Sequence, residues 1–121
     1  MSNFATNLTF EKIEYCKNIL EKLYEFSMLV LLIAKENNID IDSICTPRLN
    51  IEQELYITVP SFEVSMYINN CLIDIYNTDS SNQIKVEILH DSKLTDHVLD
   101  TTKEVLIKFI DINILPKLKK H

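Results

Sequence analysis

Apolar residues along this chain are spaced helically before Pro47 and alternate with polar residues after it. In the first part they recur at steps of three and four residues between Thr9 and Glu36, which predicts one long amphipathic helix. Thr9 is suited to the N-cap, and the asparagines at 37–38 can take the left-handed conformation that ends a helix. The predicted inner stripe of this helix is Ile13, Cys16, Leu20, Leu23, Ser27, Val30 and Ala34.

The second half of this predicted helix is apolar on every side. A helix that lies on a sheet buries only one stripe of its surface. We expect a second helix and the loop 39–44 to cover the remaining apolar side chains. The alternative is that Phe26, Leu29 and Ile33 form a self-association surface, which would make the chain a homodimer.

Four segments after Pro47 alternate apolar and polar residues, at 54–59, 62–68, 71–76 and 84–88. This period is typical of antiparallel strands with one buried face. Short loops between the segments set the register, since a slip of one residue would turn a strand inside out.

Three turns predict which residues pair across the sheet. The asparagines at 69–70 fit a two-residue type I′ turn, the dipeptide at 60–61 fits a second short turn, and 77–82 fits a longer polar loop. All three place apolar residues opposite apolar residues. They pair Val64 with Ile57 on one side and Ile75 with Ile84 on the other.

A second helix is predicted to start between Asp91 and Thr95 and to run through Ile112, with Pro116 kinking or ending it. The expected fold class is α+β. It is a four-stranded antiparallel meander sheet with an N-terminal and a C-terminal helix packed on one face (α-β-β-β-β-α). We expect a single domain over 1–121 with a short flexible N-terminus at 1–7.

The predicted registers place tyrosines and carboxylates together on the other face of the sheet. Tyrosine is enriched at protein interfaces, and carboxylates complement the lysines and arginines of a partner. An ordinary solvent-facing sheet surface has a similar composition. The candidate partner-binding residues are Glu54, Tyr56, Glu63, Tyr67, Leu72, Asp74, Tyr76 and Glu87.

Composition narrows the function classes. The chain of 121 residues contains no glycine, so it has no Walker A loop and no dinucleotide-binding glycine motif. Its formal net charge is −6 and Arg48 is its only arginine. This balance argues against direct nucleic-acid binding and favours a basic protein partner.

Candidate chemistry is sparse in this sequence. Cys45 could pair with His90 or His97 as a nucleophile, and His97 with Asp100 could share a helix face as metal ligands. None of these belongs to a known catalytic or metal motif. We therefore predict no catalytic, metal or cofactor residues, and a binding module rather than an enzyme.

Three widely spaced cysteines favour reduced thiols in a cytoplasmic protein, and no apolar run is long enough to span a membrane. The leading hypothesis is an inhibitor of immunity or antitoxin type that neutralises a basic, nuclease-like protein. One alternative is a dimeric chaperone or assembly factor for a secreted effector. A second is a phage- or plasmid-encoded inhibitor that imitates the charge of nucleic acid.

Overall fold

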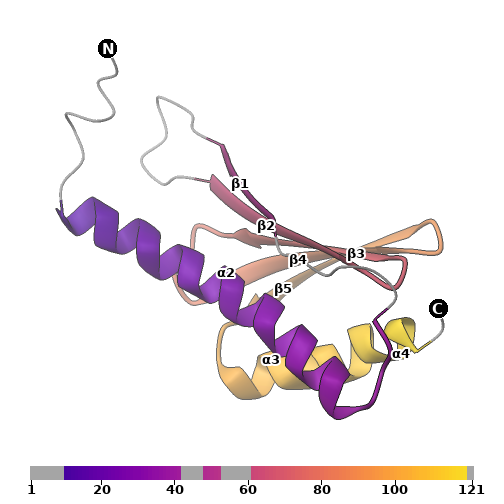
Figure 1. Cartoon of the computed structure of the whole chain (residues 1–121). Coiled ribbons are helices and arrows are strands. Elements are labelled where there is room, and N and C mark those ends of the chain that lie inside the picture. Colours follow the sequence, from indigo (N-terminus) through magenta and orange to yellow (C-terminus); the bar gives the residue numbers. More distant parts are fainter. Residues whose placement is uncertain (1–9, 42–47, 53–60, 120–121) are drawn as a thin grey trace.

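The computed structural model describes residues 10–41, 48–52 and 61–119 of the chain. The α+β class is confirmed, with an antiparallel meander between N-terminal and C-terminal helices that share one side of the sheet (Figure 1). The described strands number five, in the order β1-β2-β3-β4-β5. The elements are α2 (Phe10–Glu36), β1 (Arg48–Glu52), β2 (Ser61–Ile68), β3 (Cys71–Asn77), β4 (Gln83–His90), β5 (Lys93–Asp100), α3 (Lys103–Phe109), the π-helix η1 (Ile110–Ile114) and α4 (Leu115–Leu118).

The long helix α2 ends where the sequence predicts. Asn38 has a φ of 56°, in the left-handed region. The amide of Ile39 donates to the carbonyl of Ala34 at 3.1 Å, and the amide of Asn38 donates to the carbonyl of Lys35 at 3.0 Å. These two bonds form a Schellman motif, with asparagine in the place that glycine usually takes. The predicted N-cap, Thr9, lies outside the described residues.

The hairpin between β2 and β3 confirms the predicted register. Ile68 pairs with Cys71, and the two residues between them, Asn69 and Asn70, have φ values of 48° and 62°. Both values are positive, as a type I′ turn requires, and this turn matches the right-handed twist of the strands it joins. On the covered face of the hairpin, apolar residues therefore oppose each other in every pair.

The register between β3 and β4 differs from the prediction by two residues. Ile75 pairs with Val86 rather than Ile84, because Asn77 is still part of β3 and pairs with Ile84 itself. The side-chain oxygen of Asn77 accepts a bond from the amide of Phe62 at 2.8 Å, which holds this residue beside β2. A shift of two residues keeps every side chain on its predicted face, so the alternation of polarity does not reveal it.

The neighbour of β2 is also corrected. Val64 pairs with Leu49 of β1, and not with Ile57 as predicted. The segment 48–52 alternates apolar and polar residues just as 54–59 does, so period alone does not choose between the two. The predicted strand at 54–59 and its turn at 60–61 lie outside the described residues, except for Ser61, which begins β2.

The predicted start of the second helix is wrong, because residues 93–100 form the strand β5. Asp91 and Ser92 have φ values of 51° and 64° and make a second two-residue turn, across which His90 pairs with Lys93. Of the eight residues of β5 only Leu99 is buried. The strand therefore shows no alternation to detect, and the helix begins only at Lys103.

The core lies between the sheet and the helices. It is built from the apolar side of β2, β3 and β4, the C-terminal helices, and the buried apolar residues of α2, which are Leu23, Phe26, Val30, Ile33 and Ala34. Ile13, predicted for the inner stripe of α2, is instead 49 % exposed. Pro116 does not end those helices: the π-helix η1 precedes it and α4 continues past it. Phe26 and Ile33 belong to this core, which corrects their placement on a self-association surface, while Leu29 packs only partly against it.

Candidate protein-interaction surface

The face of the sheet that points away from the helices is here called the open face. Both helical layers pack on the opposite side, and no described helix or strand covers the open face (Figure 1). The register of the strands arranges its side chains in rows that cross the sheet. Its described members include Glu63, Ser65, Tyr67, Leu72, Asp74, Tyr76, Gln83, Lys85, Glu87, Leu89, Leu94, Asp96, Val98 and Asp100.

The first row is apolar and crosses four strands near the two hairpin turns. Tyr67 pairs with Leu72, Leu72 with Leu89, and Leu89 with Leu94. Tyr67 is 51 % exposed and Leu94 is 63 % exposed. Large apolar side chains that stand side by side in solvent mark a surface suited to a partner. We call these four residues the apolar row.

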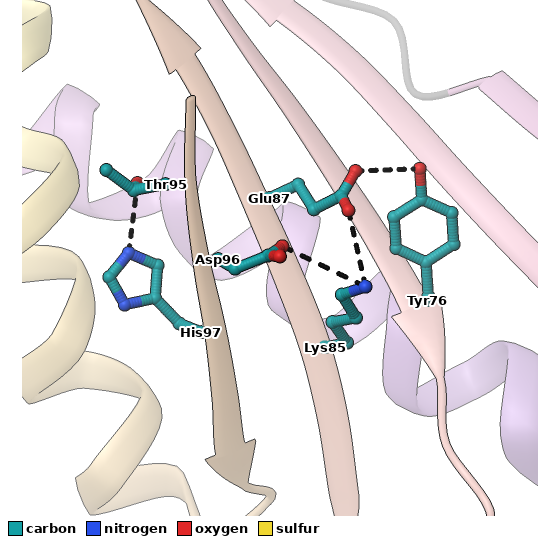
Figure 2. Close-up of polar contacts among 6 residues, drawn as sticks. All are labelled: Tyr76, Lys85, Glu87, Thr95, Asp96 and His97. Atoms are coloured by element: carbon teal, nitrogen blue, oxygen red, sulfur yellow. Dashed lines mark hydrogen bonds and ion pairs between the residues drawn. The ribbon is translucent and has the colours of Figure 1, made fainter. Parts of the chain in front are cut away.

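The second row is acidic and lies directly beside the first. Asp74 pairs with Glu87, and Glu87 pairs with Asp96, so carboxylates oppose each other on three neighbouring strands. Like charges in this position destabilise a sheet. Lys85 reduces the repulsion, with its Nζ 3.3 Å from Glu87 and 3.9 Å from Asp96 (Figure 2). We call Asp74, Glu87 and Asp96 the acidic row.

Hydroxyl groups hold the acidic row in place. The Oγ of Ser65 lies 2.5 Å from Oδ1 of Asp74 and 3.1 Å from Oε2 of Glu63, so its single proton can be donated to either carboxylate, with the shorter contact to Asp74. The hydroxyl of Tyr76 donates to Oε1 of Glu87 at 3.1 Å (Figure 2). Among the side chains that the structure describes on this face, four acidic groups are therefore linked by two neutral donors and one lysine, which leaves this part of the surface with a negative excess.

The pKa values follow from this crowding. Burial raises the pKa of Asp74, and the nearby charges of Glu63 and Glu87 raise it further, against the lowering effect of the bond from Ser65. Burial also raises the pKa of the Tyr76 hydroxyl, together with the charges of Asp74, Glu63 and Glu87 and its bond to Glu87. A cation placed on this face would act against both shifts, because a nearby positive charge favours the ionised form of each group.

Replacement of Asp74 by asparagine should stabilise the protein at neutral pH. The pKa of Asp74 is higher in the folded state than in the unfolded state, so the folded state binds the proton more tightly. The contribution of Asp74 to stability therefore falls as pH rises from the pKa of Asp74 in the unfolded state through its higher pKa in the folded state. The gain from Asp74→Asn should be full at neutral pH and shrink in the acid range. Urea unfolding across this range measures it, and Asp111→Asn, at an exposed site on η1, is the matched control.

A gain from Asp74→Asn that grows toward acid pH would contradict this account of the acidic row. Equal behaviour of Asp74→Asn and Asp111→Asn at every pH would do the same.

The structure places six of the eight predicted surface residues on the open face, namely Glu63, Tyr67, Leu72, Asp74, Tyr76 and Glu87. Glu54 and Tyr56 lie outside the described residues. The predicted register, with Ile75 opposite Ile84, also implies Lys85 opposite Asp74; this is wrong, because the shifted register places Asp74 opposite Glu87. The sequence interpretation also missed Leu89, Leu94, Asp96 and Val98; the signal for the last three is the turn-forming dipeptide Asp91-Ser92, which separates β4 from β5.

The candidate chemical residues do not come together in the described part of the chain. Burial raises the pKa of the Cys71 thiol to about 11, against the opposing charge of Lys117, so this thiol is neutral at physiological pH. His97 and Asp100 do not share a helix face. Both lie on the strand β5, where residues three positions apart point to opposite faces of the sheet. The ring of His97 instead packs edge-on against the ring of Phe109, with 4.8 Å between the ring centroids. Its Nε2 lies 3.0 Å from the hydroxyl oxygen of Thr95.

Other candidates are placed as follows. His90 Nδ1 lies 3.6 Å from Asp91, its neighbour in the turn, and Cys45 lies outside the described residues. Residues 10–41, 48–52 and 61–119 contain no cluster of three ligands arranged to hold a metal ion.

Comparisons with known proteins assign no family. No model of a protein family, no curated protein and no solved structure matches this chain. Within the described ranges, every helix is too short or too polar to cross a bilayer. Function is therefore inferred from the open face itself.

Proposed function

We propose that this chain is a small protein-binding module whose open face holds a basic protein partner. The observation that supports the proposal is the acidic row, which crosses three strands beside an exposed apolar row. A net charge of −6 gives the whole molecule the same sign as this row. A lysine- or arginine-rich surface has the complementary chemistry.

The two rows would have different roles in binding. Carboxylates attract and orient a basic surface, which increases the association rate more than the affinity. The apolar row would supply contact area from which water is removed, and Tyr67 has the large, rigid side chain typical of interface anchors. A partner cation seated between Asp74 and Glu87 would also relieve the repulsion within the acidic row.

The more specific form of the proposal is an inhibitor of immunity or antitoxin type, which covers the cationic site of a nuclease-like protein. It acts in the cytoplasm, where Cys16 and Cys71 remain free thiols. An inhibitor that imitates nucleic-acid charge would use the same acidic row against a nucleic-acid-binding protein. The identity of the captured partner separates these two forms. The dimeric chaperone is not carried further, because Phe26 and Ile33 are core residues.

Charge reversal within the acidic row should weaken partner binding strongly. Tagged protein is used to isolate the partner from the source cells, mass spectrometry identifies it, and calorimetry measures its affinity over a range of salt concentrations. Asp74→Lys with Glu87→Lys should lower the affinity about a hundredfold and flatten its salt dependence, since close charge pairs at interfaces are worth about 1.5 kcal/mol or more each. The milder pair Asp74→Asn with Glu87→Gln should lower it about tenfold.

The matched control reverses two exposed carboxylates on the helical side, Glu25 of α2 and Asp111 of η1. Glu25→Lys with Asp111→Lys changes the net charge by the same amount and should leave the affinity within about threefold of the wild type. Circular dichroism confirms that each variant is folded. If both reversed pairs weaken binding equally, the net charge and not the open face determines binding, and the proposal is wrong.

A further inference from the structure

The strand β5 is an edge of the sheet whose outer side is vacant among the described elements. It pairs with β4 only, and no described strand lies beyond it. Leu94 is 63 % exposed and Val98 is 60 % exposed, and Asp96 lies between them. An edge with exposed apolar side chains is a template on which another strand can form.

The backbone direction of β5 follows from its turn. In a two-residue turn the flanking residues face each other, and His90 pairs with Lys93 in this way. The peptide groups of Lys93 therefore point toward β4, and those of every second residue along the strand do the same. The N–H and C=O groups of Leu94, Asp96 and Val98 point outward, where an added strand would meet them.

The same three residues also carry their side chains on the open face. Leu94 ends the apolar row, Asp96 ends the acidic row, and Val98 lies opposite Lys85 in the next row. A strand added to this edge would place its own side chains as the next members of those rows. The edge thus offers main-chain hydrogen bonds and an apolar–acidic–apolar pattern together.

A second copy of this chain does not fit the pattern. In an antiparallel pair of β5 strands, the register that brings Leu94 opposite Val98 also brings Asp96 opposite the same carboxylate of the other copy. A register shifted by two residues leaves every side chain on the same face of the sheet. It places Asp96 opposite Val98 and Leu94 opposite Asp100. Each arrangement either opposes like charges or sets an apolar side chain against a carboxylate. Acidic residues at an edge discourage such self-pairing.

We propose that the basic partner binds by strand addition along β5. The segment it supplies is extended and antiparallel to β5, with a lysine or arginine opposite Asp96 and apolar residues two positions to either side, opposite Leu94 and Val98. Charge complementarity with Asp96 selects this occupant over a second copy. The inference rests on the proposed function, to which it adds the mode of recognition and the sequence pattern of the partner.

The test uses a synthetic peptide, Ser-Thr-Val-Thr-Arg-Thr-Val-Thr-Ser, with a fluorescent label. Its arginine and two valines lie on one face, and in the proposed pairing their amides point toward β5. One variant is N-methylated at both valines, and its matched control is N-methylated at the two threonines that flank the arginine. Methylation at the valines should weaken binding at least about tenfold in fluorescence anisotropy, because two main-chain bonds are lost, and the control should bind as the unmodified peptide does.

Two further measurements use the full chain. The unmodified peptide should slow hydrogen exchange at the amides of Leu94, Asp96 and Val98. The variant Asp96→Lys should lose affinity for the arginine peptide about tenfold and regain it with a peptide that carries glutamate in place of arginine, since the main-chain bonds remain.

The outcomes separate this inference from the proposed function. Equal affinity of the two methylated peptides, unchanged hydrogen exchange at β5, or no binding of any peptide would overturn strand addition. The proposed function would still stand if reversal of Asp74 and Glu87 weakens binding of the captured partner, because these residues lie on the inner strands β3 and β4 and not on the edge strand β5. If that reversal has no effect either, both proposals are wrong.

Discussion

Replacing Phe26 with alanine should lower the free energy of unfolding by about 3–5 kcal/mol. The side chain of Phe26 is 0 % exposed, and its ring centroid lies 6.2 Å from that of Phe109 at an angle of 48°. Alanine would leave a cavity where α2 meets the C-terminal helices. Because natural domains are stable by only about 5–15 kcal/mol, this single change removes a large part of the total.

The same substitution distinguishes a core residue from a self-association surface. If Phe26 held two copies together, unfolding of the wild type would depend on protein concentration, and Phe26→Ala would produce a stable monomer. We expect instead the same loss of stability in urea at low and at high protein concentration. Met28→Ala is the control, since Met28 lies on the same helix with 49 % of its surface exposed, and it should change stability by less than about 1 kcal/mol.

Replacing Asn69 with alanine should lower the free energy of unfolding by about 2–4 kcal/mol, for two separate reasons. Asn69 has a φ of 48°, and a left-handed conformation costs alanine about 1–2 kcal/mol. The Asn69 side chain, which is almost fully buried, donates to the carbonyls of Asp40 at 2.8 Å and Leu118 at 3.3 Å. Loss of the amide would leave the buried carbonyl of Leu118 and the part-buried carbonyl of Asp40 without these donors, at about 1–3 kcal/mol.

Two matched variants separate these contributions. Asn69→Gly keeps the backbone conformation and loses only the side-chain bonds, so it should be more stable than Asn69→Ala by about 1 kcal/mol. Asn70→Ala changes an exposed residue with a φ of 62°, whose side chain accepts only a long, exposed bond of 3.4 Å from the hydroxyl of Tyr67, so it should lose mainly the conformational part. Thermal unfolding of the three variants measures the difference. Equal stability of Asn69→Ala and Asn70→Ala would show that the bonds to Asp40 and Leu118 contribute nothing.

Asn69 shows how far sequence interpretation reaches at one residue. Its identity and its place between two alternating segments predict a type I′ turn, and the structure confirms that turn. Its bonds to the segment after α2 and to the end of α4 join positions 29 and 49 residues away along the chain. No local pattern carries that information, because the contact depends on where the helices lie on the sheet.

The open face could be predicted only in part. Two adjacent strands, β2 and β3, place Tyr67, Asp74 and Tyr76 as the alternation predicts. The acidic row could not be predicted, because it depends on the β3–β4 register and on β5. A shift of two residues preserves the polarity of each face, so Asp74 opposite Lys85 and Asp74 opposite Glu87 are equally consistent with the pattern. The electrostatic character of the surface changes completely between these two pairings.

The sequence by itself determined the features that depend on neighbouring residues. These are the span and end of α2, the type I′ turn at 69–70, and the covered face of the central strands, since period and turn chemistry act over a few residues. Only the tertiary structure decided which strands form the edges and which apolar residues of α2 are buried. An edge strand has one neighbour, and β5 buries only Leu99, so its residues show no alternation. Burial on a helix that is apolar all round depends on where its partners pack, which no spacing within the helix records.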